Sequence, residues 1–126
     1  MKNIKDFPFA DLIDLKIQSV ESGKSTCSVG FKRDLLNPNN VIHGGVIYSI
    51  ADTGMGAALA STLGDGEKCA TIEVKMMYLK PAEHFDLTCH TEIIKKGHRI
   101  AFLESEVFSN NELIAKASGS FAILSS

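Results

Sequence analysis

Residues 37–62 read NPNNVIHGGVIYSIADTGMGAALAST, and this stretch decides how we expect the whole chain to fold. Asparagines and a proline, which favour turns, lead into His43-Gly44-Gly45, and an apolar segment of helical length follows. Apolar or small side chains recur in it at the spacing of one helix face, at Ile47, Ile50, Ala51, Gly54, Met55, Ala58 and Leu59. The opposite face carries a single charge, so the sequence predicts a central helix that is covered on nearly every side.

Asp52 is that single charge, and the two glycines mark the start of the same helix. Aspartate is a weak helix former and is costly to bury alone, so its position indicates a candidate functional residue. The first N–H groups of a helix have no partner within it, and Gly44 and Gly45 put no Cβ in the way of a ligand. Such a helix start suits an oxygen that becomes anionic during a reaction. The simpler alternative is a tight turn into a core helix, with Asp52 paired to a neighbour.

The composition is that of an ordinary globular protein, which we expect to be one domain over residues 1–126. A net charge of −2 argues against a nucleic-acid partner, which usually meets a basic face. The first dozen residues lack the apolar core of a signal peptide, and no apolar run is long enough to cross a membrane. We therefore expect a cytoplasmic protein whose Cys27, Cys69 and Cys89 are reduced.

The rest of the chain predicts strands around the central helix. A short helix is expected over residues 6–13, with Asp6 as its cap and Phe7, Phe9 and Leu12 packed inward. Alternating apolar residues and turn signals predict strands at 15–21, 25–31, 69–79, 85–95, 99–109 and 113–124. The predicted fold class is therefore α+β, with one long helix on one face of a mostly antiparallel sheet of about six strands.

Two motifs carry a resemblance to a known family. The first is Asn37, His43-Gly44-Gly45 and Asp52, and the second is Thr71 followed by Tyr78-Leu79-Lys80-Pro81-Ala82. Together with the order of elements, they resemble the PaaI-like (phenylacetyl-CoA type) acyl-CoA thioesterases of the hotdog superfamily. The resemblance implies a hotdog fold and hydrolysis of an aryl-, short- or medium-chain acyl-CoA to the free acid and CoA.

The resemblance also implies a role for each residue of these motifs. The N–H of Gly44 would polarise the thioester carbonyl, and Asn37 would add a donor or fix the loop. Asp52 would act as general base or nucleophile, and Thr71 would position the attacking water. His43 would either orient the loop through a backbone hydrogen bond or lie near the thiolate leaving group. Each has a structural alternative, since Asn is common in turns and Thr in strands.

Substrate contacts are less readable from the sequence. Donors near the pocket mouth would hold the CoA phosphates, and the candidates are Lys80, Lys96, Gly97 and Arg99. Gly45, at the helix start, is a further candidate substrate contact. Apolar residues would line the acyl chamber, and the candidates are Met55, Met76 and Tyr78. A solvated basic loop and ordinary core packing are the alternatives. Coenzyme A enters only as part of the substrate, and the spacing of the four histidines predicts no metal site.

Helix geometry predicts an assembly. Gly44 and Asp52 are eight residues apart, which is about 12 Å along a helix axis, so one thioester cannot reach both in one chain. Two antiparallel copies of the helix would bring Gly44 of each near Asp52 of the other, which predicts an obligate homodimer with two equal, shared sites. The resemblance adds pairing of such dimers into tetramers.

Two other functions stay open. A non-catalytic acyl-CoA-binding protein could use the same fold, but it would not need Asp52. An acyl-thioester dehydratase needs a His paired with an acid, and in the enzymes of that type a Pro-rich segment surrounds the His, where this chain has VIHGGV.

Overall fold

A computed structural model of the chain describes residues 6–125. Its elements in chain order are α1 (Pro8–Ile13), β1 (Leu15–Glu21), β2 (Lys24–Val29), the 3-10 helix η1 (Arg33–Leu35), α2 (Gly44–Ala60), β3 (Glu67–Tyr78), β4 (Leu87–Lys96), β5 (Ile100–Ser109) and β6 (Glu112–Ser125). All six predicted strands are present, and their ends differ from the prediction by no more than two residues.

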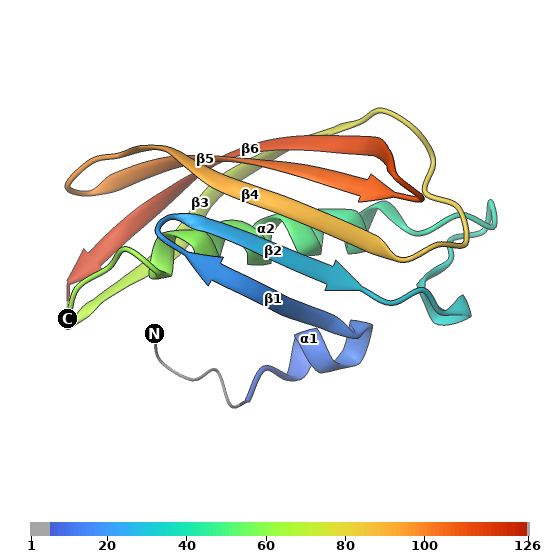
Figure 1. Cartoon of the computed structure of the whole chain (residues 1–126), viewed down its shortest axis with the longest axis horizontal. Helices are drawn as coiled ribbons and strands as arrows, with labels where there is room; N and C mark the ends of the chain where they lie inside the picture. The colour runs from blue at the N-terminus through green and yellow to red at the C-terminus, as the bar shows by residue number, and fades with distance from the viewer. Residues whose placement is uncertain (1–5, 126) are drawn as a thin grey trace.

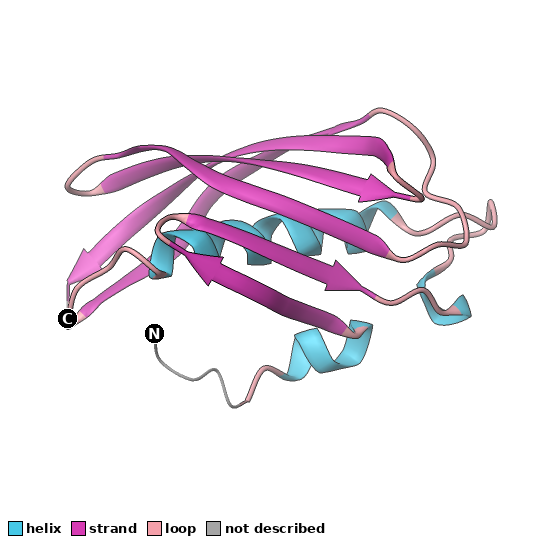
Figure 2. Cartoon of the chain, viewed as in Figure 1, coloured by secondary structure: helices cyan, strands magenta, loops and turns pink. Residues whose placement is uncertain are grey.

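The strands form one antiparallel sheet in the order β1-β2-β4-β5-β6-β3. The sheet curves around α2, which lies along its inner face (Figure 1). Figure 2 shows the same arrangement by element type, one long helix against one sheet. The predicted α+β class is confirmed, and β1 and β3 are the edge strands of the described sheet.

The inner face of the sheet and one face of α2 make the core. All seven residues of the predicted helix stripe are buried, and Ile50, Met55 and Leu59 have no exposed surface. Tyr48 and Asp52 lie on the other side of the helix and are partly exposed. Between residues 6 and 125, no helix combines the length and the apolar character that crossing a membrane requires.

The predicted orientation of the first helix is wrong for Phe9 and Leu12, whereas Phe7 packs against the core as predicted. Phe7, not Asp6, is the N-cap of α1, and no side chain caps this helix. Ala10 and Ile13 are its buried residues, whereas Phe9 and Leu12 are 48% and 68% exposed. A helix of six residues makes fewer than two turns, so its sequence does not determine which face turns inward.

Hydroxyl groups of the sheet fix the distance between sheet and helix. Ser25 Oγ donates to the carbonyl of Gly54 at 2.7 Å, and Thr91 Oγ1 is 2.7 Å from Ser105 Oγ. A Cβ on Gly54 would lie 2.7 Å from Thr91 Oγ1, whereas a Cβ on Gly56 would find its nearest neighbour at 3.9 Å. The helix therefore approaches the sheet more closely at Gly54 than at Gly56.

This difference predicts opposite effects for two glycine substitutions in the same helix. Gly54→Ala should lower the free energy of unfolding by about 1–2 kcal/mol, because the clash outweighs the helix propensity of alanine. Gly56→Ala is the matched control and should leave stability unchanged or raise it by up to about 1 kcal/mol. Chemical denaturation measures both, and equal stabilities of the two variants would contradict the close approach at Gly54.

Candidate active site

The loop before α2 is held by Asn37. Its side-chain Oδ1 accepts hydrogen bonds from the backbone N–H groups of Asn39 and Val41, at 2.9 and 3.4 Å. Its own N–H donates to the carbonyl of Val41 at 2.8 Å, and Asn40 adopts a left-handed conformation with φ of 62°. Asn37 therefore stabilises this turn through its backbone and its side-chain oxygen. Its side-chain NH₂ group has no partner among the described residues.

His43 caps the start of α2. Its Nδ1 accepts from the N–H of Gly45 at 2.8 Å, and its own N–H donates to the carbonyl of Leu35. An Nδ1 that accepts a hydrogen bond carries no proton, so the neutral ring is protonated at Nε2. The N–H of Gly45 is thereby occupied, whereas the N–H of Gly44 has no acceptor within residues 6–125. Gly44 thus presents the free donor of this helix start.

Tyr78, at the end of β3, lies over the same helix start. Its hydroxyl donates to the carbonyl of Gly44 at 2.9 Å. A Cβ on Gly44 would be 3.2 Å from that hydroxyl, and a Cβ on Gly45 would be 3.0 Å from Nδ1 of His43. Both glycines therefore make room for side chains of this chain, in addition to any ligand.

Asp52 and Thr71 meet on the exposed side of α2. Thr71 Oγ1 donates to Asp52 Oδ1 at 2.7 Å. The carboxylate projects from the middle of the helix, opposite the buried stripe, and the threonine belongs to the edge strand β3. One carboxylate oxygen is thus held, and the other has no partner among the described residues.

The two methionines proposed for the acyl chamber lie in or against the core. Met55 is fully buried, and its Sδ packs so closely against β6 that a Cβ on Gly119 would lie 2.6 Å from it. The structure therefore corrects the expectation for Met55, because a substrate could not reach it without opening the helix–sheet contact. Met76 is partly buried and packs against the same core.

The basic candidates lie at two separate places. Lys80 follows β3 and forms an ion pair with Glu112. Lys96 donates from Nζ to the carbonyl of Thr62 at 2.8 Å, just beyond the end of α2. Gly97 and Arg99 follow it in the β4–β5 turn, which lies at the opposite end of the molecule from the start of α2 (Figure 1). Within one chain, this turn and Gly44 are therefore not brought together.

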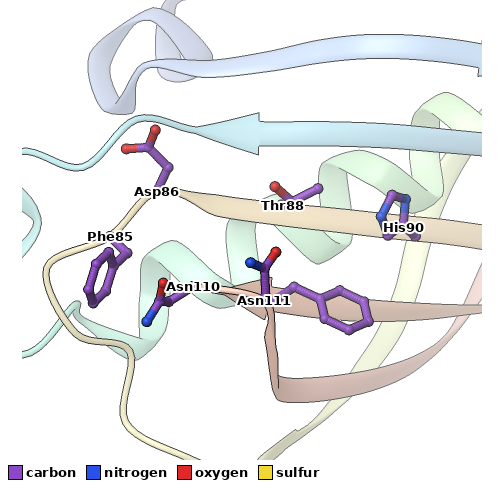
Figure 3. Close-up of a pocket in the computed structure, with 7 residues that line it drawn as sticks. Phe85, Asp86, Thr88, His90, Asn110 and Asn111 are labelled. Atoms are coloured by element: carbon purple, nitrogen blue, oxygen red, sulfur yellow. The ribbon is translucent and has the colours of Figure 1, made fainter.

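A surface hollow of about 570 Å³ lies apart from these residues, at the start of β4 (Figure 3). It is lined by Phe85, Asp86, Thr88, His90, Phe108, Asn110 and Asn111. The ring of His90 packs edge-on against Phe108, and Nδ1 of His90 lies 3.2 Å from the hydroxyl of Thr26. No pattern in the sequence pointed to this hollow, because its residues come from a loop, two strands and a turn.

Chemically, the site offers a carboxylate and an unpartnered N–H. These are the parts that hydrolysis of an ester or thioester uses, one to activate water and one to stabilise the oxyanion. The described residues contain no cluster of three or more His, Cys, Asp or Glu side chains that could hold a metal ion.

Comparison with known proteins agrees with this chemistry. An open antiparallel sheet curved around one long helix is the hotdog fold, and residues 39–116 match the family model described as the thioesterase superfamily. The chain belongs to that superfamily.

Relatives support the assignment over nearly the full chain. A protein of Archaeoglobus fulgidus named "Putative esterase" is 32% identical over 94% of this chain and 80% of its own. The solved structure of a conserved Pseudomonas aeruginosa protein has a TM-score of 0.90 and 28% identity, covering 94% of this chain and 95% of that one. A mutant structure of the phenylacetic acid degradation protein PaaI from Thermus thermophilus, at 22% identity, shares the fold with a TM-score of 0.87 over 94% of this chain and 100% of its own.

The thiols differ in how far they are shielded. Burial, and the neighbouring Cys89, raise the pKa of Cys27 to about 12, and burial raises the pKa of Cys89 to about 11. Burial, and then the negative charge of Asp52, also raise the pKa of Cys69. Since the thiolate is the reactive form, all three thiols should be poor nucleophiles.

We therefore expect the native protein to resist disulfide reagents. At pH 8 the thiolate fraction of Cys27 is on the order of 10⁻⁴, so neither it nor Cys89 should react, while Cys69 reacts slowly. Denaturation should expose all three thiols of the chain. Mass spectrometry of the labelled protein measures each site, and rapid native labelling of Cys27 or Cys89 would contradict the burial described above.

Proposed function

We propose that this chain is an acyl-CoA thioesterase, which hydrolyses an aryl-, short- or medium-chain acyl-CoA to the free acid and CoA. The observation that carries the proposal is the hydrogen bond from Thr71 to Asp52 on the exposed side of a helix whose first N–H, at Gly44, has no acceptor among the described residues. Membership of the thioesterase superfamily supports the reaction type.

In the proposed mechanism, the free oxygen of Asp52 takes a proton from a water molecule as the water attacks the thioester carbonyl carbon. Thr71 fixes the other oxygen and so the direction of the carboxylate. The carbonyl oxygen becomes negative in the tetrahedral intermediate, and Gly44 N–H donates to it. Collapse of the intermediate breaks the C–S bond, and the proton passes to the leaving thiolate, giving one acid and one CoA thiol.

The proposal includes a homodimer, because Gly44 and Asp52 are too far apart in one helix to serve one substrate. Two features support pairing. The first is the edge strand β3, which is 12 residues long. Three large apolar side chains in it or directly after it are each about half exposed, namely Ile72, Met77 and Leu79. A long apolar edge of this kind is typical of one that another chain covers. The exposed side of α2 is built largely from small residues, among them Ser49 and Ala60, which allow a second helix to approach closely.

The dimer also gives the β4–β5 turn a role. In an antiparallel pair, the C-terminal end of one α2 lies beside the N-terminal end of the other, so the turn of one chain faces Gly44 of its partner. Arg99 would then be the main cation for the CoA phosphates, because Lys96 already caps the helix through Thr62. Dimers of dimers are part of the same proposal.

The reaction is tested by following thiol release from a panel of acyl-CoAs with the wild type and with Asp52→Asn. The wild type should turn over at least one aryl-, short- or medium-chain substrate, and the variant should lose about 10²–10⁴-fold in kcat because the base is gone. Asp65→Asn, in an exposed turn, is the matched control and should keep full activity. Binding of acyl-CoA without release of thiol would replace the enzyme with a non-catalytic acyl-CoA-binding protein.

The shared site is tested by mixing two inactive variants. Gly44→Pro removes the proposed oxyanion donor while fitting the first helical position, since His43 has ψ of 135°. Gly44→Ala adds a Cβ but keeps the N–H, so it controls for the contact with Tyr78. Gly44→Pro should lose about 10²–10³-fold in kcat relative to Gly44→Ala.

Equal amounts of Gly44→Pro and Asp52→Asn, unfolded and refolded together, should then regain activity. Half of the dimers would be mixed, and each mixed dimer would have one intact site of two, giving about a quarter of the wild-type rate. Mixtures that stay inactive would mean that each site comes from one chain.

A further inference from the structure

One peptide group at the start of α2 is held from both sides. The carbonyl of Gly44 and the N–H of Gly45 belong to the same peptide plane. Tyr78 Oη donates to the carbonyl at 2.9 Å, and His43 Nδ1 accepts from the N–H at 2.8 Å. The two side chains come from different elements, β3 and the cap of the helix, so they fix this peptide against the sheet as well as within the loop.

Fixing this peptide fixes the free donor beside it. Gly44 N–H belongs to the preceding peptide, whose carbonyl, that of His43, accepts from Val46 N–H at 3.0 Å. With both peptides that flank Gly44 bonded, the remaining freedom of the Gly44 N–H direction is small. Glycine is otherwise the most flexible residue at such a position, and two glycines in succession would leave the donor poorly directed.

Tyr78 is suited to act as the donor in this arrangement. Burial, and the neighbouring Tyr48, raise the pKa of the Tyr78 phenol, so its hydroxyl keeps its proton at neutral pH. The ring also lies against Gly44, since a Cβ there would be 3.3 Å from two ring carbons. A Cβ at position 44 would require the phenol to shift by a few tenths of an ångström.

We propose that Tyr78 is a positioning residue of the site: with His43 it clamps the Gly44–Gly45 peptide and so directs the Gly44 N–H toward the substrate carbonyl. The sequence had suggested a different task for Tyr78, as part of the acyl chamber. The inference rests on the proposed function for the meaning of the N–H, although the clamp itself consists of the two hydrogen bonds described above.

Removing the phenol oxygen tests the clamp. Tyr78→Phe keeps the ring and loses the hydrogen bond, and it should lower kcat roughly three- to tenfold with KM changed less than twofold. Tyr48→Phe is the matched control, because the Tyr48 hydroxyl has no hydrogen-bond partner among the described residues, and it should keep kcat within about twofold. A change of KM that depends on the acyl group, with kcat unchanged, would return Tyr78 to the acyl chamber and overturn the proposal.

A double-variant cycle separates positioning through Gly44 from any other effect. In the Gly44→Pro background the donor is absent, so adding Tyr78→Phe should cost nothing further in kcat. The same loss of roughly three- to tenfold in both backgrounds would mean that Tyr78 acts independently of the Gly44 N–H, which would also overturn the proposal.

Amide hydrogen exchange followed by NMR tests the clamp without activity. The Gly45 amide should exchange several-fold faster in Tyr78→Phe than in the wild type, and as slowly as in the wild type in Tyr48→Phe. An unchanged Gly45 amide would overturn the clamp even if the enzyme were active. Faster exchange in a protein that hydrolyses no acyl-CoA would instead uphold the clamp and refute the proposed function.

Discussion

Seven apolar or small residues of α2 lie against the inner face of the sheet, and their burial determines where every other face of this helix points. Burying Ile50, Met55 and Leu59 is worth about 1.5–3 kcal/mol for each side chain. Turning the helix by one residue would expose part of this surface and would carry Asp52 toward the core, where an unpaired carboxylate is costly. The position of the acid thus follows from the packing of its neighbours.

The edge strand β3 connects this packing to the site. It reaches Asp52 through Thr71 and Gly44 through Tyr78, so one strand contacts both residues of α2 that we propose to be catalytic. Thr71 and Tyr78 are seven residues apart in this strand, and they contact positions eight residues apart on the helix. The strand is held in turn by its long pairing with β6, which leaves its other edge unpaired within the described residues.

The sequence predicted the elements well because each has a clear period. The helix stripe repeats over 17 residues and each strand over 6 to 14, long enough for the pattern to identify the buried face. In α1, six residues cover fewer than two helical turns, so the pattern failed, and Phe9 and Leu12 are exposed. The spacing of apolar residues shows which face of a helix is buried, but it does not show what that face packs against. Met55 was therefore correctly predicted to point inward, but was also assigned to an acyl chamber, although it is fully buried between helix and sheet.

The sequence named the residues of the candidate site but did not show which of them contact one another. Asp52 could be predicted because it is the single charge in an otherwise apolar helix. Thr71 could be predicted because it lies seven residues before Tyr78 in the second motif. The glycines were interpreted as space for a ligand, yet the spaces at Gly44 and Gly45 are taken up largely by Tyr78 and His43. The absence of two Cβ atoms lets side chains of this chain satisfy the Gly44 carbonyl and the Gly45 N–H, and the Gly44 N–H is left without an acceptor among residues 6–125. Because the neighbouring peptide is clamped, this N–H points in one fixed direction, which is what stabilisation of an oxyanion requires of a donor.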